Sequence, residues 1–417
     1  MVSRGIKAWV MLGLALVFYA YESMLRVSPS IMSHDLMTDF DITAAGLSNL
    51  AAYYYYIYTP MLLLVGLLMD RFGPRVLLSI ATLVCTIGAF SMGYAETIMA
   101  AKFGRFMIGF GSSFAFVGVL KLAANWLPKS MIAIAAGITM AVGMIGGFFC
   151  DSVLPHWVAQ YGWRATTLGS AWFGLVLFIL LIIVLRDSTG VKSPRAKVAE
   201  SMREVFGNMF SILRDRNLWV NGMIGCMMWL PIAIYAETWG NGYLVDVRGF
   251  NPEQASSINS WVFIGWAVGG PMLGYLSDYF KRRKLLLSLG SLVSAAMFVL
   301  FFSVHFNPFF MGFILFLAGL AGSTQVLVFA VSRDNVSSVA SGSAAAFTNL
   351  LVMLAGIIQP LSGYIMDIVQ DRGLSVHHYS PESYSAALAL VPIALLISCF
   401  LSLLIKDKLF QKSSAER

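Results

Sequence analysis

The sequence predicts an all-α membrane protein with twelve transmembrane helices in two six-helix bundles and with both termini in the cytoplasm. Three observations predict this class. The 417 residues are 58% hydrophobic and only 12% charged, about half of the roughly 25% charged residues of soluble domains. Apolar runs of about 18 or more residues, long enough to cross a bilayer, recur along the chain. A charged segment and an internal repeat divide these runs into two sets of six.

Each predicted span is an apolar run that ends at a charged, Gly-containing or Pro-containing break, such as DRFGPR at 70–75 or DYFKRRK at 278–284. The first run is too long for a secretory signal, lacks a small-x-small cleavage site and is followed by further spans. We therefore expect it to be retained. In order, the predicted spans are 7–28, 43–69, 75–95, 98–124, 131–156, 165–186, 218–243, 254–279, 285–305, 307–331, 342–369 and 383–405.

The net charge of +7 is explained by where the basic residues lie. They gather in the predicted cytoplasmic segments, among them Arg71, Arg75, the run 281–284 and the tail 406–412, and are few in the predicted outer loops. This is the positive-inside asymmetry of membrane proteins. We therefore expect a lipid bilayer as partner and no nucleic acid. The four cysteines lie in apolar spans without CxxC spacing, so we expect no disulfide framework and no metal.

The domain prediction is an N-terminal bundle over 1–186, a cytoplasmic linker over 187–216 and a C-terminal bundle over 217–417. The linker is rich in charge and contains no spanning run. The repeat pairs GLLMDRFGPR at 66–75 with GYLSDYFKRR at 274–283 after the second span of each half. Repeated six-span halves are typical of transporters whose two bundles rock around a central site.

The first copy of the repeat resembles the G-x-x-x-D-R-x-G-R signature of the major facilitator superfamily, while the second departs from it at Tyr279 and Lys281. The resemblance implies a gating role, because an Asp at a helix end can accept hydrogen bonds and Gly allows close helix approach. The alternative is a basic inner loop that only sets topology. The gating candidates are Gly66, Asp70, Arg71, Gly73, Arg75, Asp278 and Arg283.

The fourth span carries GRFMIGFGSS, which resembles the superfamily's R-x-x-x-G-x-G pattern through Arg105, Gly109 and Gly111. The glycines favour a tight helix contact. An intramembrane Arg is costly and faces the bundle interior in most cases. The resemblance implies that Arg105 handles protons or substrate anions, and the alternative is a structural ion pair. The Gly-Pro pattern of family antiporters is missing from GITMAVGMIGG at 137–147, which disfavours drug efflux.

Glu22 is the leading candidate for proton coupling, because it lies deep in the first span, four residues before Arg26 and on the same helical face. Burial and a neighbouring cation shift a carboxyl's proton affinity in opposite directions, so opening one side of a cavity would change both. Glu237 and Asp151, also within spans, are the rival proton carriers.

The substrate-binding candidates are polar or aromatic residues inside spans, and ordinary helix-to-helix packing is the alternative for each. Span two holds the unusual Tyr-rich run AAYYYYIYTP, in which Tyr53 and Tyr56 share one face and Tyr54 and Tyr58 share another. At least one of these hydroxyls is expected to orient a polar ligand. The candidates are Tyr19, Arg26, Tyr53, Tyr56, Arg105, Tyr235, Trp239, Gln325, Asn349 and Gln359.

Residues 18–75 also resemble a narrower group, the phagosomal nutrient transporters of intracellular gamma-proteobacteria, through YESMLRVSPS and the Tyr-rich span. The sequence departs from that group at Thr59, where the group has Gln. The resemblance implies a multi-pass protein of the bacterial inner membrane that imports an amino acid or a related small nutrient such as a nucleoside. We expect a proton-coupled secondary transporter. The alternative is an organic-anion or siderophore carrier, importing or exporting.

Other classes of protein are disfavoured. The five His are scattered, and neither HExxH nor GxSxG occurs, so we expect no enzyme activity. We expect no sensor, because the predicted linker and tail are short for an output domain. No P-loop sequence is present, which disfavours ATP-driven transport. We expect a monomer with a small-molecule substrate, protons as coupling ion and no cofactor.

Overall fold

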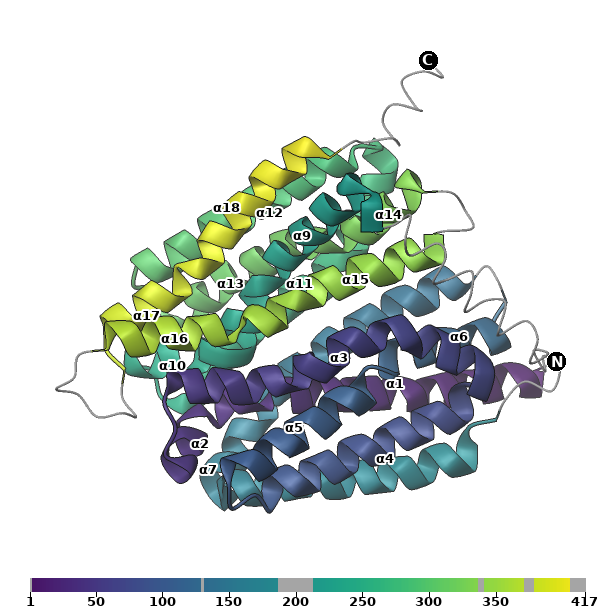
Figure 1. Cartoon of the computed structure of the whole chain (residues 1–417), viewed down its shortest axis with the longest axis horizontal. Helices are drawn as coiled ribbons and strands as arrows, with labels where there is room; N and C mark the ends of the chain where they lie inside the picture. The colour runs from purple at the N-terminus through teal and green to yellow at the C-terminus, as the bar shows by residue number, and fades with distance from the viewer. Residues whose placement is uncertain (1, 129–130, 187–212, 337–340, 371–378, 406–417) are drawn as a thin grey trace. The chain divides into compact units, whose positions relative to one another are not determined.

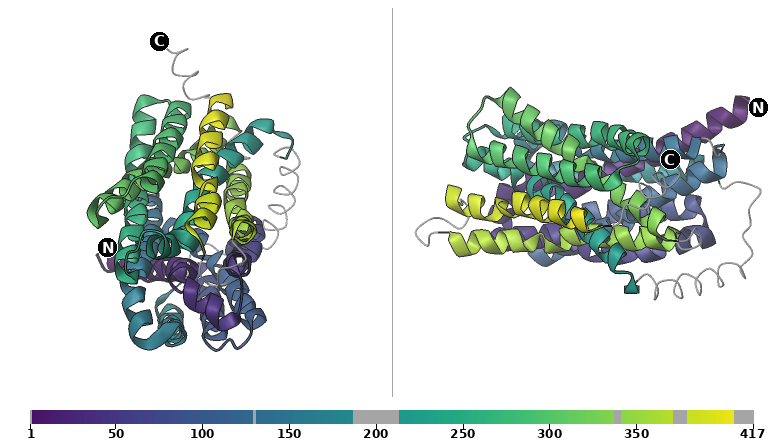
Figure 2. Two further views of the ribbon diagram at one scale, coloured as in Figure 1. Left: turned by 90° about the vertical axis from the view of Figure 1, so that its left-hand side faces the viewer. Right: turned by 90° about the horizontal axis from the view of Figure 1, so that it is seen from above.

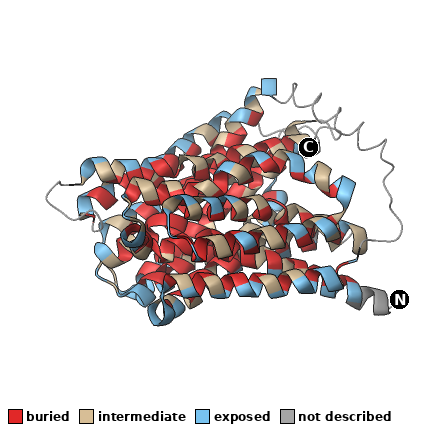
Figure 3. Cartoon of the chain, turned by 60° about the horizontal axis from the view of Figure 1, so that its bottom comes forward, coloured by how far each residue is buried: buried red, intermediate tan, exposed pale blue. Residues whose placement is uncertain are grey.

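The computed structural model describes residues 2–128, 131–186, 213–336, 341–370 and 379–405. Within these ranges the chain forms helices and no strand, which confirms the all-α prediction. Most of the predicted linker 187–216 lies outside the described residues. Most helices expose one side and bury the other (Figure 3), whereas Pro231–Trp239 is buried throughout.

Glycine and proline set the limits of the helices in the first half of the chain. Gly73 has a φ of 81° at the turn between the second and third long helices. Gly162, with a φ of 77°, is a non-helical point inside the longest helix, which is therefore two helices joined by a tight turn. The helices are α1 (Val2–Ile31), α2 (Ser33–Phe40), α3 (Ala44–Phe72), α4 (Pro74–Gly93), α5 (Ile98–Ser112), α6 (Ala115–Trp126) and α7 (Ile132–Val184).

Proline also interrupts helices in the second half. Pro231 begins a π-helical stretch, and Pro360 begins a new helix directly after Gln359. The elements are α9 (Arg216–Leu230), η2 (Pro231–Trp239), α10 (Gly240–Asp246), α11 (Pro252–Phe280), α12 (Arg283–Ser303), α13 (Pro308–Gly322), η3 (Ser323–Val326), α14 (Leu327–Asn335), α15 (Ser341–Ile358), α16 (Pro360–Val369), α17 (Pro381–Leu388) and α18 (Leu390–Leu404).

Ten helical stretches in the described part of the chain are long and apolar enough to cross a membrane. One of them, Ile134–Val184, runs through the turn at Gly162 and so covers the predicted spans 131–156 and 165–186. Helix α11 matches the predicted span 254–279 but is not among the ten, because Ser, Asn and several Gly make it less apolar. The number twelve stays a prediction.

The chain divides into two compact units. The first contains residues 1–28 and 53–205. In it α4 packs against α5 and α7 (Figure 1). Helices α4 and α5 approach closely at two glycines: a β carbon built on Gly88 would lie 2.6 Å from the backbone oxygen of Gly104. Any larger side chain at this crossing would force the helices apart.

The second unit contains residues 29–52 and 206–417. Here α9 packs against α15, α11 against α13, and α12 against α18 (Figure 2). The α11–α13 contact is again close, since a β carbon on Gly265 would lie 2.2 Å from the backbone oxygen of Phe316. The end of α1, all of α2 and the start of α3 thus pack with elements from the other half of the sequence. The predicted domain boundary at 187–216 stays a prediction.

Candidate functional site

The Glu22 carboxyl group lies in the interior of the first unit with 1% of the residue exposed. The Tyr54 hydroxyl donates a hydrogen bond to Glu22 Oε2 at 3.0 Å, and the Ser23 hydroxyl donates to Oε1 at 3.2 Å. The Ser112 side chain is a third hydrogen-bond partner. Hydroxyls from α1, α3 and α5 therefore hold the carboxyl group.

Arg26 is the cation that the sequence predicts beside the Glu22 carboxyl group. It is buried, lies one turn beyond Glu22 and acts on it electrostatically. The Tyr19 ring experiences the charges of both residues. Helix α7 packs on this ring, because a β carbon on Gly143 would lie 2.6 Å from Tyr19 Cε1. The structure thus brings together three predicted site residues: Tyr19, Glu22 and Arg26.

Arg105 contacts the backbone of α1. Its Nη1 donates to the Leu25 carbonyl at 2.7 Å and its Nη2 to the Arg26 carbonyl at 3.2 Å. The helix makes the first of these carbonyls available, because the residue four positions after Leu25 is Pro29, which has no N–H to donate. Arg105 therefore supplies a hydrogen bond that the helix backbone cannot make, and it is 1% exposed.

Tyr54 connects Arg105 with Glu22. The guanidinium of Arg105 lies over the Tyr54 ring, 5.4 Å from its centroid, while the hydroxyl of the same ring binds Glu22. A β carbon on Gly109 would lie 2.1 Å from the Tyr54 backbone oxygen, so α5 and α3 touch here. A β carbon on Gly111 would lie 2.4 Å from the Ala81 oxygen. The predicted tight helix contact at Gly109 and Gly111 is confirmed.

The two tyrosines predicted to bind substrate lie on another face of α3. Tyr53 and Tyr56 pack edge to face with ring centroids 5.3 Å apart, and Tyr56 is 36% exposed. Lys102 lies over the Tyr53 ring at 5.2 Å. The structure does not bring this pair to Glu22, and their predicted role stays a prediction.

The second unit holds the other predicted polar residues of span seven, all in the π-helical stretch η2. Glu237 is buried. The Tyr235 ring packs against those of Phe298 and Phe301 at 5.5 Å. The Trp239 indole donates to the Ser362 hydroxyl at 2.8 Å. Isolated π-helical turns are frequent at functional sites, so this stretch is the second place where site chemistry is expected.

The four remaining candidates for proton coupling or substrate binding lie on different elements. Asp151 is buried on α7, Gln325 is buried on η3, and Asn349 is partly buried on α15. Gln359 is buried at the break between α15 and α16 and contacts η2. Asp151 belongs to the unit that contains Glu22, and the other three belong to the second unit.

The first copy of the repeat forms contacts within its own unit. Asp70 and Lys121 form an ion pair, and Arg75 Nη2 donates to the Ile182 carbonyl at 3.3 Å. Arg71 lies over the Phe72 ring. A β carbon built on Gly66 meets no atom within 4 Å, and the predicted gating role of this residue stays a prediction. Here Gly66 faces open space.

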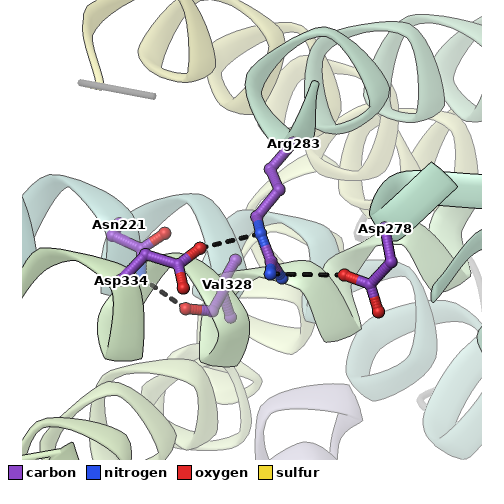
Figure 4. Close-up of polar contacts among 5 residues, drawn as sticks. All are labelled: Asn221, Asp278, Arg283, Val328 and Asp334. Atoms are coloured by element: carbon purple, nitrogen blue, oxygen red, sulfur yellow. Dashed lines mark hydrogen bonds and ion pairs between the residues drawn. The ribbon is translucent and has the colours of Figure 1, made fainter. Parts of the chain in front are cut away.

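In the second copy Arg283 binds two carboxylates (Figure 4). Its Nη2 lies 3.3 Å from Asp278 Oδ1, and its Nε lies 2.8 Å from Asp334 Oδ2. The neighbouring Asn221 donates to the Val328 carbonyl at 2.7 Å. Arg283 therefore ties the ends of α11, α12 and α14 together on one side of the unit.

Sequence reasoning missed four partners of three predicted residues: Tyr54 and Ser112 at Glu22, Lys121 at Asp70, and Asp334 at Arg283. The sequence offered a signal for the two charged partners. Lys121 and Asp334 are ionisable residues near the inner ends of the fourth and tenth predicted spans, and each of these spans is the second one after a copy of the repeat. No comparable signal distinguishes Tyr54 from its four neighbouring tyrosines.

The chain belongs to the Major Facilitator Superfamily, whose family model matches residues 10–360. It is similar to a probable sulfoacetate transporter of Cupriavidus necator, with 24% identity over 86% of this chain and 87% of that protein. It is also similar to a hexuronate transporter of Bacillus subtilis, with 23% identity over 82% and 84%. A lysosomal dipeptide transporter of Danio rerio shares 24% identity over 70% of this chain and 65% of its own.

The fold is that of solved transporters of this family. A bacterial homologue of the human lysosomal transporter Spinster, solved in an inward-facing, unoccupied conformation, superimposes with a TM-score of 0.72 over 98% of this chain and 97% of that one. The sequence identity is 15%, so the likeness concerns the fold alone. The family and the apolar helices together define a multi-pass membrane transporter.

Proposed function

We propose that this chain is a secondary active transporter that imports a small polar nutrient with a carboxylate, such as an amino acid, together with protons across the bacterial inner membrane by alternating access. One observation carries the proposal. A buried carboxyl group, Glu22, is held by three hydroxyls beside the buried cation Arg26. A carboxyl group in such a place can exchange a proton whenever its access to water changes.

The geometry supports separate roles for the two arginines. Both guanidinium nitrogens Nη1 and Nη2 of Arg105 bind backbone carbonyls of α1, so Arg105 supports the turn that carries Arg26. Arg26 is then the stronger candidate for the carboxylate of the substrate, because guanidinium and carboxylate match in geometry and charge. Glu22 carries the proton, and Glu237 and Asp151 remain its rivals.

An organic-anion carrier is the second candidate. The names of two relatives, a sulfoacetate transporter and a hexuronate transporter, favour it, whereas the dipeptide transporter favours a zwitterion. Both candidates need a cation for the acid group and differ in whether an ammonium group accompanies it. A thermal-shift screen of the purified protein with amino acids, dipeptides, sugar acids and sulfonates separates them.

The test of coupling uses proteoliposomes with an imposed pH gradient and a labelled acid taken from that screen. We expect Glu22→Gln to reduce gradient-driven accumulation by about tenfold or more, the equivalent of roughly 1.4 kcal/mol of lost driving force. Exchange of labelled for unlabelled substrate needs no net proton movement and should persist in this variant.

Glu96→Gln is the matched control, because Glu96 is an exposed carboxylate in the loop after α4, and it should accumulate substrate like the wild type. Full gradient-driven accumulation by Glu22→Gln would overturn the assignment of the proton. If Glu237→Gln or Asp151→Asn abolished accumulation in its place, the proton carrier would be that residue.

A further inference from the structure

The side-chain oxygen of Gln359 is a buried acceptor at the π-helical stretch. We infer that it receives a hydrogen bond from the transported molecule, so that the substrate is an organic acid that also carries a hydroxyl or ammonium group. The inference rests on the proposed function and deepens it by naming the substrate class.

Two breaks in neighbouring helices meet at this residue. Pro231 cannot donate to the carbonyl four residues before it, and the backbone from there to Trp239 winds as a π-helix. Gln359 lies between α15 and α16, directly before Pro360. Its Nε2 donates to the Ala233 carbonyl at 2.6 Å and also contacts the Thr238 hydroxyl. The side chain thus spans from one break to the other.

These contacts fix which way the amide points. The Thr238 hydroxyl uses its one hydrogen to donate to the Ala233 carbonyl at 2.8 Å, so it can offer only lone pairs to Gln359. The Ala233 carbonyl is an acceptor as well. Both atoms that face the amide are therefore acceptors, and the amide nitrogen must face them. A reversed amide would place three acceptors together.

With its nitrogen so placed, the Gln359 side-chain oxygen takes no part in these contacts with η2. Oε1 has less than 1 Å² of accessible surface and no hydrogen-bond partner among the described residues. The residue is 1% exposed. Its backbone carbonyl accepts a hydrogen bond from the Ser362 hydroxyl at 2.7 Å. Ser362 is held in turn by Trp239. Two acceptors fix the amide nitrogen, so the amide cannot turn to bring its oxygen to another donor.

A buried acceptor without a donor is unfavourable, and a ligand that brings a donor removes that cost. The Ala233 carbonyl and the Thr238 hydroxyl beside the amide are acceptors as well, which favours a hydroxyl or ammonium group over an anion. The acid group of the substrate then binds elsewhere, at a cation.

The experiment measures binding of matched acids to the purified full-length protein. Propionate, lactate and alanine differ only at the second carbon, which carries hydrogen, hydroxyl or ammonium; succinate, malate and aspartate form a second such set. We expect at least one donor-bearing acid of a set to bind about tenfold or more tightly than its donor-free member, because a site built to bond a donor rejects the analogue that lacks it. The hydroxyl and ammonium members distinguish the two sources of the donor.

Two variants test the residue. Gln359→Met keeps the length of the side chain but removes the oxygen. It should reduce the preference for the donor-bearing acid over the donor-free acid to about threefold or less. Thr238→Val removes the hydroxyl that contacts Nε2 but leaves Oε1, so it should lower the melting temperature and keep the preference. If Gln359→Met fails to fold, the comparison of matched acids on the wild type still decides.

Equal binding of donor-free and donor-bearing acids to the wild type would overturn the inference and leave the proposed function intact. So would a Gln359→Met variant that folds and keeps the full preference. If no acid of these sets or of the wider screen stabilises the protein, the proposed function fails and the inference fails with it.

Discussion

Pro29 explains why an arginine is buried against the first helix. The proline removes the N–H that would bond the Leu25 carbonyl, and Arg105 takes its place at 2.7 Å. The Ser28 hydroxyl donates to the same carbonyl at 3.0 Å. Because Glu22 lies one turn before Leu25, the arginine supports the backbone that positions the Glu22 carboxyl group. Arg105 is therefore interpreted as a positioning residue.

This interpretation predicts a rescue. Arg105→Lys should destabilise the protein by about 2 kcal/mol, since one ammonium cannot reproduce the two-pronged contact and hydrogen bonds from charged groups contribute roughly 1.5–3 kcal/mol each. Pro29→Ala restores an N–H four residues after Leu25. In the presence of Pro29→Ala, Arg105→Lys should destabilise the protein by about 1 kcal/mol less than it does in the wild type. A double-mutant cycle of thermal unfolding measures this difference.

An additive double variant would contradict this account, because the two residues would then act independently. Lys102→Arg is the control for exchanging Arg and Lys, because it makes the reverse change on the same helix. It should leave the melting temperature within about 1 °C of the wild-type value.

Sequence could predict part of this site. Glu22 and Arg26 were recognisable because four-residue spacing places them on one helical face, and burial of Arg105 followed from the cost of a charge in the membrane. Its partners were not recognisable. They are main-chain carbonyls, which carry no sequence signal, and pairing residue 105 with residue 25 requires knowing how α5 packs on α1. Tyr54 was missed for the same reason, since packing alone selects it among adjacent tyrosines.

At the scale of elements, the N-terminus of α3 is capped by distant parts of the chain. Its first N–H, from Ala44, donates to the Tyr379 hydroxyl at 2.8 Å, and the second, from Ala45, donates to Asp367 Oδ2 at 3.2 Å. The Tyr379 hydroxyl itself donates to Asp367 Oδ1 at 2.5 Å. The N-terminus of a helix attracts negative charge, so Asp367 satisfies both the donors and the dipole.

Burial and the hydrogen bond to Asp367 raise the pKa of Tyr379 well above its ordinary value. The protonated hydroxyl is the form that binds Asp367. Its contribution to stability is therefore fully present below about pH 10, the pKa of a free Tyr, and is lost only as the pH rises through the higher value in the folded protein. The cap should not weaken at physiological pH.

Removing the cap should cost about 0.5–2 kcal/mol. We expect Asp367→Ala to lower the melting temperature measurably and Asp367→Asn to lower it less, because the amide can still accept a hydrogen bond but carries no charge. Glu382→Ala removes an exposed carboxylate from the first turn of α17 and serves as control. Equal melting temperatures for Asp367→Ala and Glu382→Ala would show that the cap contributes nothing.

The limits of the helices were predictable where composition changes sharply, as at Gly73 and at the acidic segment before α3. The π-helical stretch was not, because Pro231 in a span predicts a kink without specifying its form. Side chains decide it here: Thr238 and Gln359 both bond the Ala233 carbonyl, and Gln359 is distant in sequence. The ion pair of Arg283 with Asp334 likewise depends on how α12 and α14 pack.

At the scale of the whole molecule, the chain passes between its two units more than once. Residues 29–52 leave the first unit at Pro29, pack with the second and return at Tyr53. Besides the cap of α3, Asn241 Nδ2 donates to the Ser30 hydroxyl at 2.9 Å, and a β carbon on Gly363 would lie 2.0 Å from the Ser48 hydroxyl. The segment 29–52 therefore packs as an integral part of the second unit.

This connectivity predicts the behaviour of a cut chain. A protease site inserted within 190–205 and cleaved after purification should leave two fragments that elute together in mild detergent, because the first fragment contributes the segment 29–52 to the second unit. Gly363→Leu, which would collide with Ala44 and Ser48, should promote their separation during size-exclusion chromatography. Clean separation of the unaltered fragments would contradict the assignment of 29–52.

In the intact chain the same segment is tethered at both ends, by Ser28 on one side and Tyr53 on the other. A short tether keeps a detached group at an effective concentration in the millimolar range or above, so each separation is followed by rapid return. Single substitutions along this contact should therefore change how often it opens far more than how fast it re-forms. Because the chain holds the segment at both ends, loss of this contact is reversible in the intact protein and irreversible only after a cut.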